Sequence, residues 1–401
     1  MTALGDTVPR AGSVRVVEVS TQIVNVPYDR REVSYQVARD GVTSVLVSVR
    51  TDDGLVGWGE ACPGADAASV EAAVRAMTPM VVGRDPWQRE QMRADLLHHG
   101  LWQFRAMTAS FAWAGIDMAL WDVVGRATRQ PLHRLLGGHR RTSVNYFWYL
   151  SRGDDEDLRQ QCATGRAAGF TVFYLKVGLR FADDLRMVAA VRDAIGPDAV
   201  LRLDANGGWS VAEALRHLEV LAAYDIDFIE QPVKEFPIEL MAEVRNRSSV
   251  AVAANEGLWT EADVLQRLLG RTADVLCFSQ YWVGSLQTFQ RLAALAAMMG
   301  VGVCKHTHGE LGLAAAAAQH VLLTLPSIVD GNQQTATHMV GDILVDPLPI
   351  AHGPEWGVPQ EPGLGVEVDP AAVDDAARRY ATEGQYLPYQ LEDLRSSWVE
   401  V

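Results

Sequence analysis

Residues 200–232 read VLRLDANGGWSVAEALRHLEVLAAYDIDFIEQP. Val200–Asp204 is a short apolar strand, Val211–Tyr224 follows as a helix, and Phe228–Glu230 is a second strand. Two strands joined through a helix pair in parallel, because the helix returns the chain to the starting edge of the sheet. Each of these strands ends in a carboxylate, at the edge where parallel α/β proteins carry their reactive groups.

The same alternation of short strands and helices extends on both sides of this unit. Further strands are expected at Val144–Leu150, Val172–Val177, Val250–Ala253, Val275–Ser279, Val301–Cys304 and Ile328–Val329. Further helices are expected at Asp155–Ala168, Ala182–Ile195, Pro237–Arg247, Glu261–Leu269, Leu286–Met299 and Leu311–Leu323. This α/β pattern favours a closed parallel barrel. The alternative, an open doubly wound sheet, needs a glycine-rich phosphate turn after its first strand, and Leu150–Gly153 is a poor one.

The chain before the barrel has a different texture. Strands at Val14–Val26, Ser44–Arg50 and Leu55–Glu60, the last two joined by a turn at Thr51–Gly54, precede a helical region from Ala67 to Arg129. This order predicts an α+β unit, with a short antiparallel sheet followed by helices.

The chain after the barrel carries a turn at Pro362–Gly365 and cannot continue the alternation. We therefore expect it to pack back on the N-terminal unit. The predicted division is a capping α+β domain over residues 1–138, a barrel over residues 139–356 and a C-terminal segment over residues 357–401 that completes the cap.

Three successive barrel strands end in a carboxylate. These are Asp204, Glu230 and Glu256, spaced at equal intervals of 26 residues. A single carboxylate after a strand is commonly a helix cap. Three that converge on one rim would repel each other unless a cation lay between them, and a set of oxygen ligands suits Mg²⁺. The spacing therefore predicts a magnesium site at the mouth of the barrel, with Asn206 on the same face as Asp204.

Two further strand ends carry groups that transfer protons. Tyr174 and Lys176 lie on one face of the second barrel strand, and the seventh strand is followed by His306 and His308. A lysine and a histidine on two sides of a bound molecule can remove a proton from one face and deliver one to the other. His306 is nearer to its strand and is preferred as the second group, with His308 as the alternative.

Composition limits the partners and the compartment. The chain has 401 residues and a formal net charge of −15, which argues against nucleic acid or an anionic membrane as the main partner. Four widely spaced cysteines without a CxxC pair fit reduced thiols and a cytoplasmic location. Met1–Ser13 has no apolar leader segment, and no apolar run approaches the roughly 20 residues of a membrane span.

Several motifs together resemble the enolase superfamily, and within it the mandelate racemase/muconate lactonizing enzyme family. They are GIDMALWDVVGR at Gly115–Arg126, LLGG at Leu135–Gly138, DANGGW at Asp204–Trp209, FIEQP at Phe228–Pro232 and PGLG at Pro362–Gly365. The resemblance spans nearly the whole chain. It implies a modified TIM barrel, (β/α)₇β, under an α+β cap whose loops near Asn25–Arg31 and Trp58–Ala61 close the site.

The resemblance also implies roles for individual residues. Asp204, Glu230 and Glu256 resemble the family's Mg²⁺ ligands, Lys176 resembles its catalytic lysine, and His306 stands where the mandelate racemase branch has its histidine. A homo-oligomer is implied as well.

This chain departs from the family pattern at several positions. Tyr174 stands where a second lysine is frequent, and Asn255 precedes Glu256 where Gly or Asp is usual. Ser279 stands where the sixth strand usually ends in Asp or Lys, so the histidine lacks its usual carboxylate. Glu310 or Asp330 is a candidate substitute for that carboxylate.

The expected reaction is Mg²⁺-assisted removal of the α-proton of a small carboxylate substrate, through an enediolate intermediate. Return of a proton to carbon, or a cycloisomerisation, makes the enzyme an isomerase. Protonation of a leaving β-hydroxyl makes it a dehydratase of a hydroxy or sugar acid. A remote alternative is a carboxylate-binding protein without catalysis, since fold does not dictate function.

Overall fold

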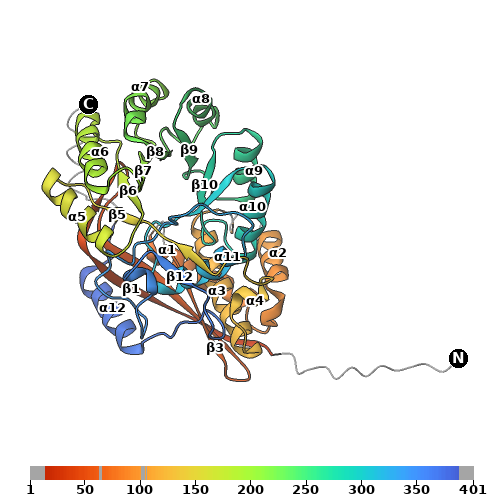
Figure 1. The fold of residues 1–401 in the computed structure, drawn as a ribbon. Coiled ribbons are helices and arrows are strands. Elements are labelled where there is room, and N and C mark those ends of the chain that lie inside the picture. The colour runs from red at the N-terminus through yellow and green to blue at the C-terminus, as the bar shows by residue number, and fades with distance from the viewer. Residues whose placement is uncertain (1–13, 63–65, 101–103, 105, 388–401) are drawn as a thin grey trace, which may run out of the picture.

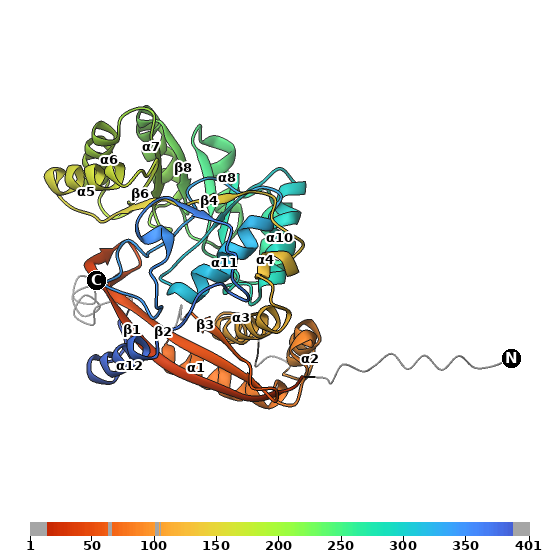
Figure 2. The same ribbon diagram turned by 60° about the horizontal axis from the view of Figure 1, so that its bottom comes forward.

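The computed structural model describes residues 14–62, 66–100, 104 and 106–387. The segment Met1–Ser13, for which no apolar leader was expected, lies outside these ranges. Figure 1 shows a curled parallel sheet with helices along its outer side, and Figure 2 shows an antiparallel sheet on the other side of the molecule.

Seven strands form one parallel sheet in the order β11-β10-β9-β8-β7-β6-β5. They are β5 Trp148–Leu150, β6 Val172–Lys176, β7 Val200–Asp204, β8 Ile226–Glu230, β9 Ala251–Ala254, β10 Val275–Phe278 and β11 Gly302–Lys305. The register aligns Lys176 with Asp204, and Asp204 with Glu230. The carboxyl ends of β6, β7 and β8 are therefore level, which brings the predicted base and two predicted metal ligands into one row.

A helix follows each of these strands. The helices are α5 Asp155–Ala167, α6 Phe181–Ile195, α7 Val211–Leu221, α8 Glu239–Arg247, α9 Glu261–Leu269, α10 Leu286–Met298 and α11 Gly312–Thr324. Local caps explain several of their first residues. Ser210 and Glu213 form a reciprocal capping box at α7, and the Thr260 and Ser285 side chains accept the backbone amides that begin α9 and α10.

The predicted eighth strand at Ile328–Val329 is wrong. The segment is irregular, although Val329 N donates to the Val303 carbonyl at 2.9 Å, and two residues on, Gly331 has a φ of +69°, outside the extended region. It nevertheless spans the gap between the sheet edges. Gln333 N donates to the Lys305 carbonyl at 2.9 Å on one side, and Asn332 N donates to the Asn145 carbonyl at 2.9 Å on the other.

The predicted first strand, Val144–Leu150, is divided in two. Ser143–Asn145 forms β4, which pairs antiparallel with β12 (Glu355–Gly357), and only β5 joins the barrel. The backbone changes partners between them, because Tyr146 N donates to the Pro354 carbonyl and Phe147 N donates to the Asn332 carbonyl.

The N-terminal region forms the antiparallel sheet β1-β2-β3 with helices against it. Its elements are β1 Val16–Val33, β2 Ala38–Thr51, β3 Val56–Ala61, α1 Ala67–Met77, α2 Arg89–His99, α3 Thr108–Thr128 and α4 Leu132–Leu135. The β1–β2 hairpin extends beyond the predicted strand ends, to Val33 and Ala38. Helix α3 crosses β3 closely, since a Cβ on Gly59 would lie 2.1 Å from the Gly115 carbonyl oxygen.

The C-terminal segment contains α12 (Pro370–Glu383), which packs against β1. Asn25 Nδ2 donates to the Gly384 carbonyl at 2.7 Å, and Arg379 donates to the Asn25 carbonyl at 3.1 Å. Short 3₁₀ turns at Thr78–Met80, Pro86–Gln88, Ala222–Tyr224 and Pro349–Ala351 complete the elements.

One buried side chain of the cap holds a barrel helix. Helix α11 has no side-chain cap of its own, and Glu60 on β3 takes that place. Its two carboxylate oxygens accept the amides of Leu311 at 2.8 Å and Ala314 at 3.0 Å. Ser44 donates to the same carboxylate at 2.8 Å, so the contact joins β2, β3 and α11.

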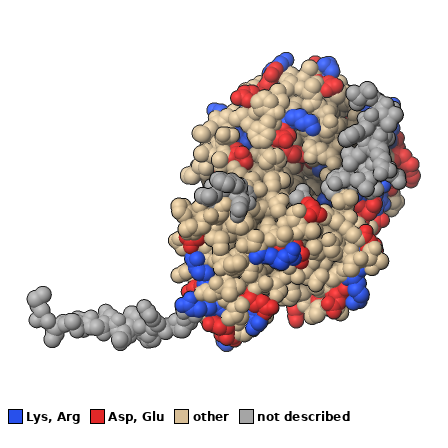
Figure 3. Space-filling view, turned by 180° about the vertical axis from the view of Figure 1, so that it is seen from behind, with Lys and Arg blue, Asp and Glu red and all other residues tan. Residues whose placement is uncertain are grey.

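The surface carries charges of both signs. Lys and Arg side chains are interspersed with Asp and Glu over the face in Figure 3. No helix among the described residues is long and apolar enough to cross a lipid bilayer.

Candidate active site

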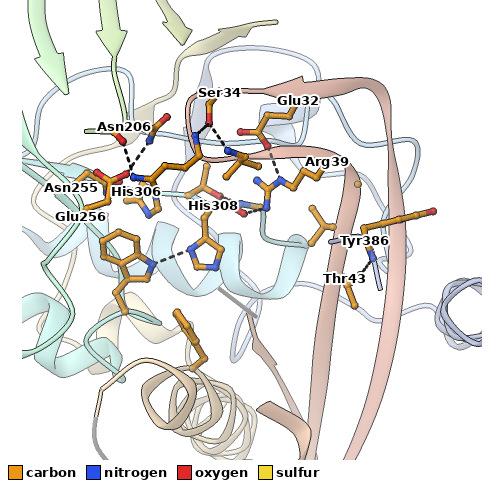
Figure 4. Close-up of a pocket in the computed structure, with 18 of the residues that line it drawn as sticks. Glu32, Ser34, Arg39, Thr43, Asn206, Asn255, Glu256, His306, His308 and Tyr386 are labelled. Atoms are coloured by element: carbon orange, nitrogen blue, oxygen red, sulfur yellow. Dashed lines mark hydrogen bonds and ion pairs between the residues drawn. The ribbon is translucent and has the colours of Figure 1, made fainter. Parts of the chain in front are cut away.

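A pocket of about 220 Å³ lies between the carboxyl ends of the barrel strands and the β1–β2 hairpin (Figure 4). Its barrel wall includes Lys176, Asn206, Asn255, Glu256, Trp259, Trp282, His306 and His308. Its cap wall includes Glu32, Ser34, Gln36 and Arg39. Most of the residues singled out from strand ends therefore line one cavity.

Lys176 and Asp204 make the central contact of the site. Lys176 Nζ lies 2.5 Å from Asp204 Oδ2, and the two side chains are 12% and 1% exposed. Burial alone would lower the pKa of Lys176. The charges of Asp204, Glu32 and Glu230 outweigh that effect, and the pKa is raised.

Neutral donors connect the three predicted carboxylates. Tyr174 Oη lies 2.6 Å from Asp204 Oδ2 and 3.1 Å from Glu230 Oε2. Asn206 Nδ2 lies 3.1 Å from Asp204 Oδ2 and 3.1 Å from Glu256 Oε1. Tyr174 therefore links Asp204 to Glu230, and Asn206 links Asp204 to Glu256.

Burial and a neighbouring charge raise the pKa values of Glu256 and Glu230. Burial, followed by the charge of Asp204, raises the pKa of Glu256 to about 7. The same two causes raise the pKa of Glu230 well above its usual range, against the opposing effects of Lys176 and Gln333. Buried carboxylates held near one another form a site that gains from a bound cation.

The donor chemistry of the site fits a hard divalent cation. Glu256 Oε2 and Asn206 Oδ1 are buried oxygens without a hydrogen-bond partner, close to the Lys176–Asp204 pair. Carboxylate and amide oxygens are the ligands that Mg²⁺ prefers. Across residues 14–62, 66–100, 104 and 106–387, no three His, Cys, Asp or Glu side chains already surround a single metal position.

Both histidines line the pocket, and burial lowers both of their pKa values. The pKa of His308 falls to about 3, and that of His306 falls well below its usual value. The Trp282 indole packs against His306 at a tilted angle, with ring centroids 4.4 Å apart, and its Nε1–H donates to His308 Nδ1 at 3.0 Å. Because His308 Nδ1 accepts that bond, the neutral ring carries its proton on Nε2. His306 Nδ1 has no partner.

The remaining candidates have mostly supporting positions. Asn255 Nδ2 donates to the Cys277 carbonyl at 2.8 Å, and Ser279 Oγ is buried without a hydrogen-bond partner. Glu310 does not substitute for the missing carboxylate, because it forms a buried ion pair with Lys305. Asp330 is exposed, and within the described residues it makes no hydrogen bond or ion pair with His306.

The segments Asn25–Arg31 and Trp58–Ala61 themselves lie within β1 and β3, and the hairpin end that follows Arg31 reaches the pocket. Residues 63–65, which follow Ala61 closely, lie outside the described residues. In the hairpin end, Glu32 and Arg39 form an ion pair of 2.7 Å with side chains 11–13% exposed, and Arg39 also donates to the His308 carbonyl. Sequence reasoning missed both residues, since neither stands at a barrel strand end.

Gln333 was missed for a different reason. Its Nε2 donates to both oxygens of Glu230, at 3.1 and 2.8 Å, and its carbonyl accepts from Lys305 Nζ at 3.1 Å. It stands four residues beyond the strand expected at Ile328–Val329. If the expected strand had been extended through the turn at Gly331, Gln333 would have stood at its end and would have been a candidate site residue.

Comparison with known proteins gives matches over nearly the whole chain. Residues 16–137 match the family described as "Mandelate racemase / muconate lactonizing enzyme, N-terminal domain". Residues 157–372 match the family described as "Enolase C-terminal domain-like".

Curated relatives catalyse several reactions. D-galactarolactone cycloisomerase from Agrobacterium fabrum is 32% identical over 375 residues, which are 90% of this chain and 98% of that protein. N-succinyl-L-Arg/Lys racemase from Bacillus cereus is 27% identical, over 81% of this chain and 88% of its own. Arabinonate dehydratase from Saccharolobus solfataricus is 25% identical, also over 81% of this chain and 88% of its own.

Solved structures agree with this fold. Muconate lactonizing enzyme from Pseudomonas fluorescens, complexed with muconolactone, superposes with a TM-score of 0.84 at 26% identity, covering 91% of this chain and 99% of that one. A dipeptide epimerase from Enterococcus faecalis, complexed with Mg and a dipeptide, has a TM-score of 0.82 at 23% identity, covering 88% and 99%.

Proposed function

This chain belongs to the mandelate racemase/muconate lactonizing enzyme family of the enolase superfamily, and we propose that it isomerises a small carboxylate by removing the proton next to the carboxylate group. It is an enzyme whose relatives are cycloisomerases, racemases, epimerases and dehydratases. The observation that carries the proposal is the contact of Asp204 with Lys176, whose side chain lines the same pocket as His306.

Asp204, Glu230 and Glu256 are the proposed ligands of Mg²⁺. When bound there, the cation supplies positive charge beside the substrate carboxylate and neutralises the acids that now raise the pKa of Lys176. The unpartnered oxygens of Glu256 and Asn206 support this assignment. Tyr174 and Gln333 orient Asp204 and Glu230 through their hydrogen bonds.

Lys176 is the proposed base. Its ammonium-bearing end lies in the pocket, held toward Asp204, and the substrate α-carbon enters beside it. Proton removal by the neutral amine of Lys176 gives an enediolate, whose α-carbon then takes up a proton on its other face. His306 is the proposed group on that face, with His308 as the alternative.

The protonation of the histidines favours isomerisation over dehydration. Both rings are neutral near pH 7, because burial lowers their pKa values. A neutral imidazole is a weak acid for expelling a β-hydroxyl as water. Protonation of the strongly basic enediolate carbon requires a less strong acid. Dehydration of a hydroxy acid is the second candidate, because the pocket is rich in polar side chains.

Solvent deuterium exchange tests the proposal. Carboxylates related to the substrates of the relatives, such as galactarolactone, muconate and N-succinyl-lysine, are incubated in D₂O with Mg²⁺ and followed by NMR. We expect α-deuterium uptake in one of them, lost in Lys176→Ala and retained in Lys234→Ala, a control at an exposed lysine outside the pocket. Loss of hydroxyl to give a keto acid would select the dehydratase. Exchange that survives Lys176→Ala would reject the assigned base.

The proposed setting is the cytoplasm and the proposed assembly is a homo-oligomer. The described cysteines are all free and buried, which supports a reducing compartment. Light scattering of the purified full-length protein gives its mass, and a monomeric mass would reject the assembly.

A further inference from the structure

A second, smaller cavity lies on the other side of Glu32 from the main pocket. Its volume is about 10 Å³, and its walls include Tyr28, Tyr149, Thr335 and His338. Glu32 lines both cavities, so its side chain is their shared wall. Figure 4 shows the other side of that wall, where Glu32 meets Arg39.

Four hydrogen-bonding atoms in this chamber lack a partner. They are Tyr28 Oη, Tyr149 Oη, Thr335 Oγ1 and His338 Nε2. The four residues are at most 9% exposed. The hydroxyls of Tyr28 and Thr335 are close enough to interact, but they form no hydrogen bond of satisfactory geometry. Buried polar groups are almost always paired, so four orphans around one cavity indicate a missing partner.

The polarity of the walls defines the chemistry of that partner. His338 Nδ1 lies 3.3 Å from the Asp29 carboxylate, so in the neutral ring Nδ1 carries the proton and Nε2 accepts. Burial raises the pKa of Tyr149 well above its usual range, so its phenol keeps its proton and must donate. A group that fits both must donate and accept at one atom, as a hydroxyl oxygen does.

Size and charge narrow the choice further. A cavity needs roughly 10–15 Å³ to hold one water-sized oxygen, which matches this chamber. The wall contains both the Glu32 carboxylate and the Arg30 side chain, so charges of both signs lie beside the chamber and a neutral oxygen fits it. We propose that the chamber of Tyr28, Tyr149, Thr335 and His338 is a subsite of the active site that binds one hydroxyl-type oxygen, supplied by a substrate hydroxyl or by a resident water. The part of this inference in which a substrate supplies the oxygen rests on the proposed function.

The test uses the Mg²⁺-loaded full-length protein and two probes of equal charge and carbon skeleton, tartrate and succinate. Titration calorimetry should show tartrate bound about tenfold more tightly, a difference carried by hydroxyl contacts. Tyr149→Phe should bring the ratio of affinities close to one and leave succinate within about twofold. Tyr146→Phe is the matched control, because the Tyr146 hydroxyl is buried but bonded to Gln319 at 2.8 Å, away from the chamber.

High-resolution crystal structures of the free and bound protein assign the source of the oxygen. A tartrate hydroxyl in the chamber supports the substrate source. A single water present in the free protein, and retained with both acids bound, supports the resident source. An empty chamber in all three structures, with a ratio unchanged by Tyr149→Phe, overturns the proposal. If neither acid binds, the proposed function loses support, while the density in the free protein still decides the subsite.

Discussion

Lys176 Nζ and Asp204 Oδ2 are 2.5 Å apart, so the proposed base occupies an oxygen of the proposed metal site. Asp204 Oδ2 also accepts hydrogen bonds from Tyr174 Oη and Asn206 Nδ2. Three donors therefore surround this oxygen, and a further group can approach it only by displacing Lys176, Tyr174 or Asn206. A divalent cation that uses this oxygen must compete with the ammonium group of Lys176.

The competition predicts opposite effects of one substitution on binding and catalysis. Lys176→Met removes a positive charge beside Asp204, so Mg²⁺ affinity should rise about five- to tenfold while α-proton exchange is lost. Calorimetric titration of Mg²⁺ measures the affinity. Lys234→Met, at an exposed lysine, should leave both unchanged. Weaker Mg²⁺ binding in Lys176→Met would contradict the assignment of Asp204 as a ligand.

Tyr174 is predicted to stabilise the folded protein most strongly when the metal is absent. Tyr174→Phe removes the hydroxyl placed between Asp204 and Glu230, and should lower the free energy of unfolding by about 1–3 kcal/mol without Mg²⁺. Saturating Mg²⁺ should restore part of this loss, since the cation offsets the same repulsion. Urea denaturation measures both values. Tyr146→Phe loses a bond to Gln319 instead, and its deficit should not respond to Mg²⁺.

Glu60 is predicted to be a stability determinant far from the chemistry. Glu60→Ala leaves the amides of Leu311 and Ala314 without their acceptors and should cost about 2–4 kcal/mol, measured as a shift of the urea midpoint. Glu18→Ala removes an acid on β1 of the same sheet, where Glu18 forms an exposed ion pair with Arg50. That control should cost about 0–1 kcal/mol. Equal costs would mean that capping of α11 from the other domain is unimportant.

Asp117 on α3 predicts a pH dependence. Burial raises its pKa to about 6, against the attraction of Arg89. A raised pKa in the folded state favours the protonated form, so this contribution is present below about pH 4 and is lost as the pH rises through about 6. Asp117→Asn keeps an acceptor for the Leu286 amide and stays neutral. Its stability relative to wild type should therefore increase by up to about 3 kcal/mol between pH 4 and pH 7. A difference that is constant with pH would contradict this.

The barrel strands could be predicted because each is a buried apolar run with polar residues at its end. Val200–Asp204 and Val275–Phe278 agree with the expected strands within a residue. The same pattern indicated Lys176, Asp204 and Glu256 as neighbours around one site. Their roles, and the domain boundaries at 138/139 and 356/357, stay predictions.

Contacts between distant segments could not be predicted in the same way. Glu32 and Arg39 reach the site because the cap folds over the barrel, and their local sequence carries no sign of it. Barrel closure depends on hydrogen bonds of an irregular segment, including the Lys305 amide to Asn332 Oδ1 at 2.8 Å, which no periodic pattern records. Periodicity describes how a segment buries its own side chains, not which remote segment it meets.

The position of α12 has a consequence for synthesis on the ribosome. Strand β1 is made first and lies at the edge of its sheet, and its outer neighbour is a helix at residues 370–383. All of the barrel strands must therefore leave the exit tunnel before α12 can cover β1. The barrel can form earlier, but the cap that delivers Glu32 to the pocket is completed only after residues 370–383 have emerged.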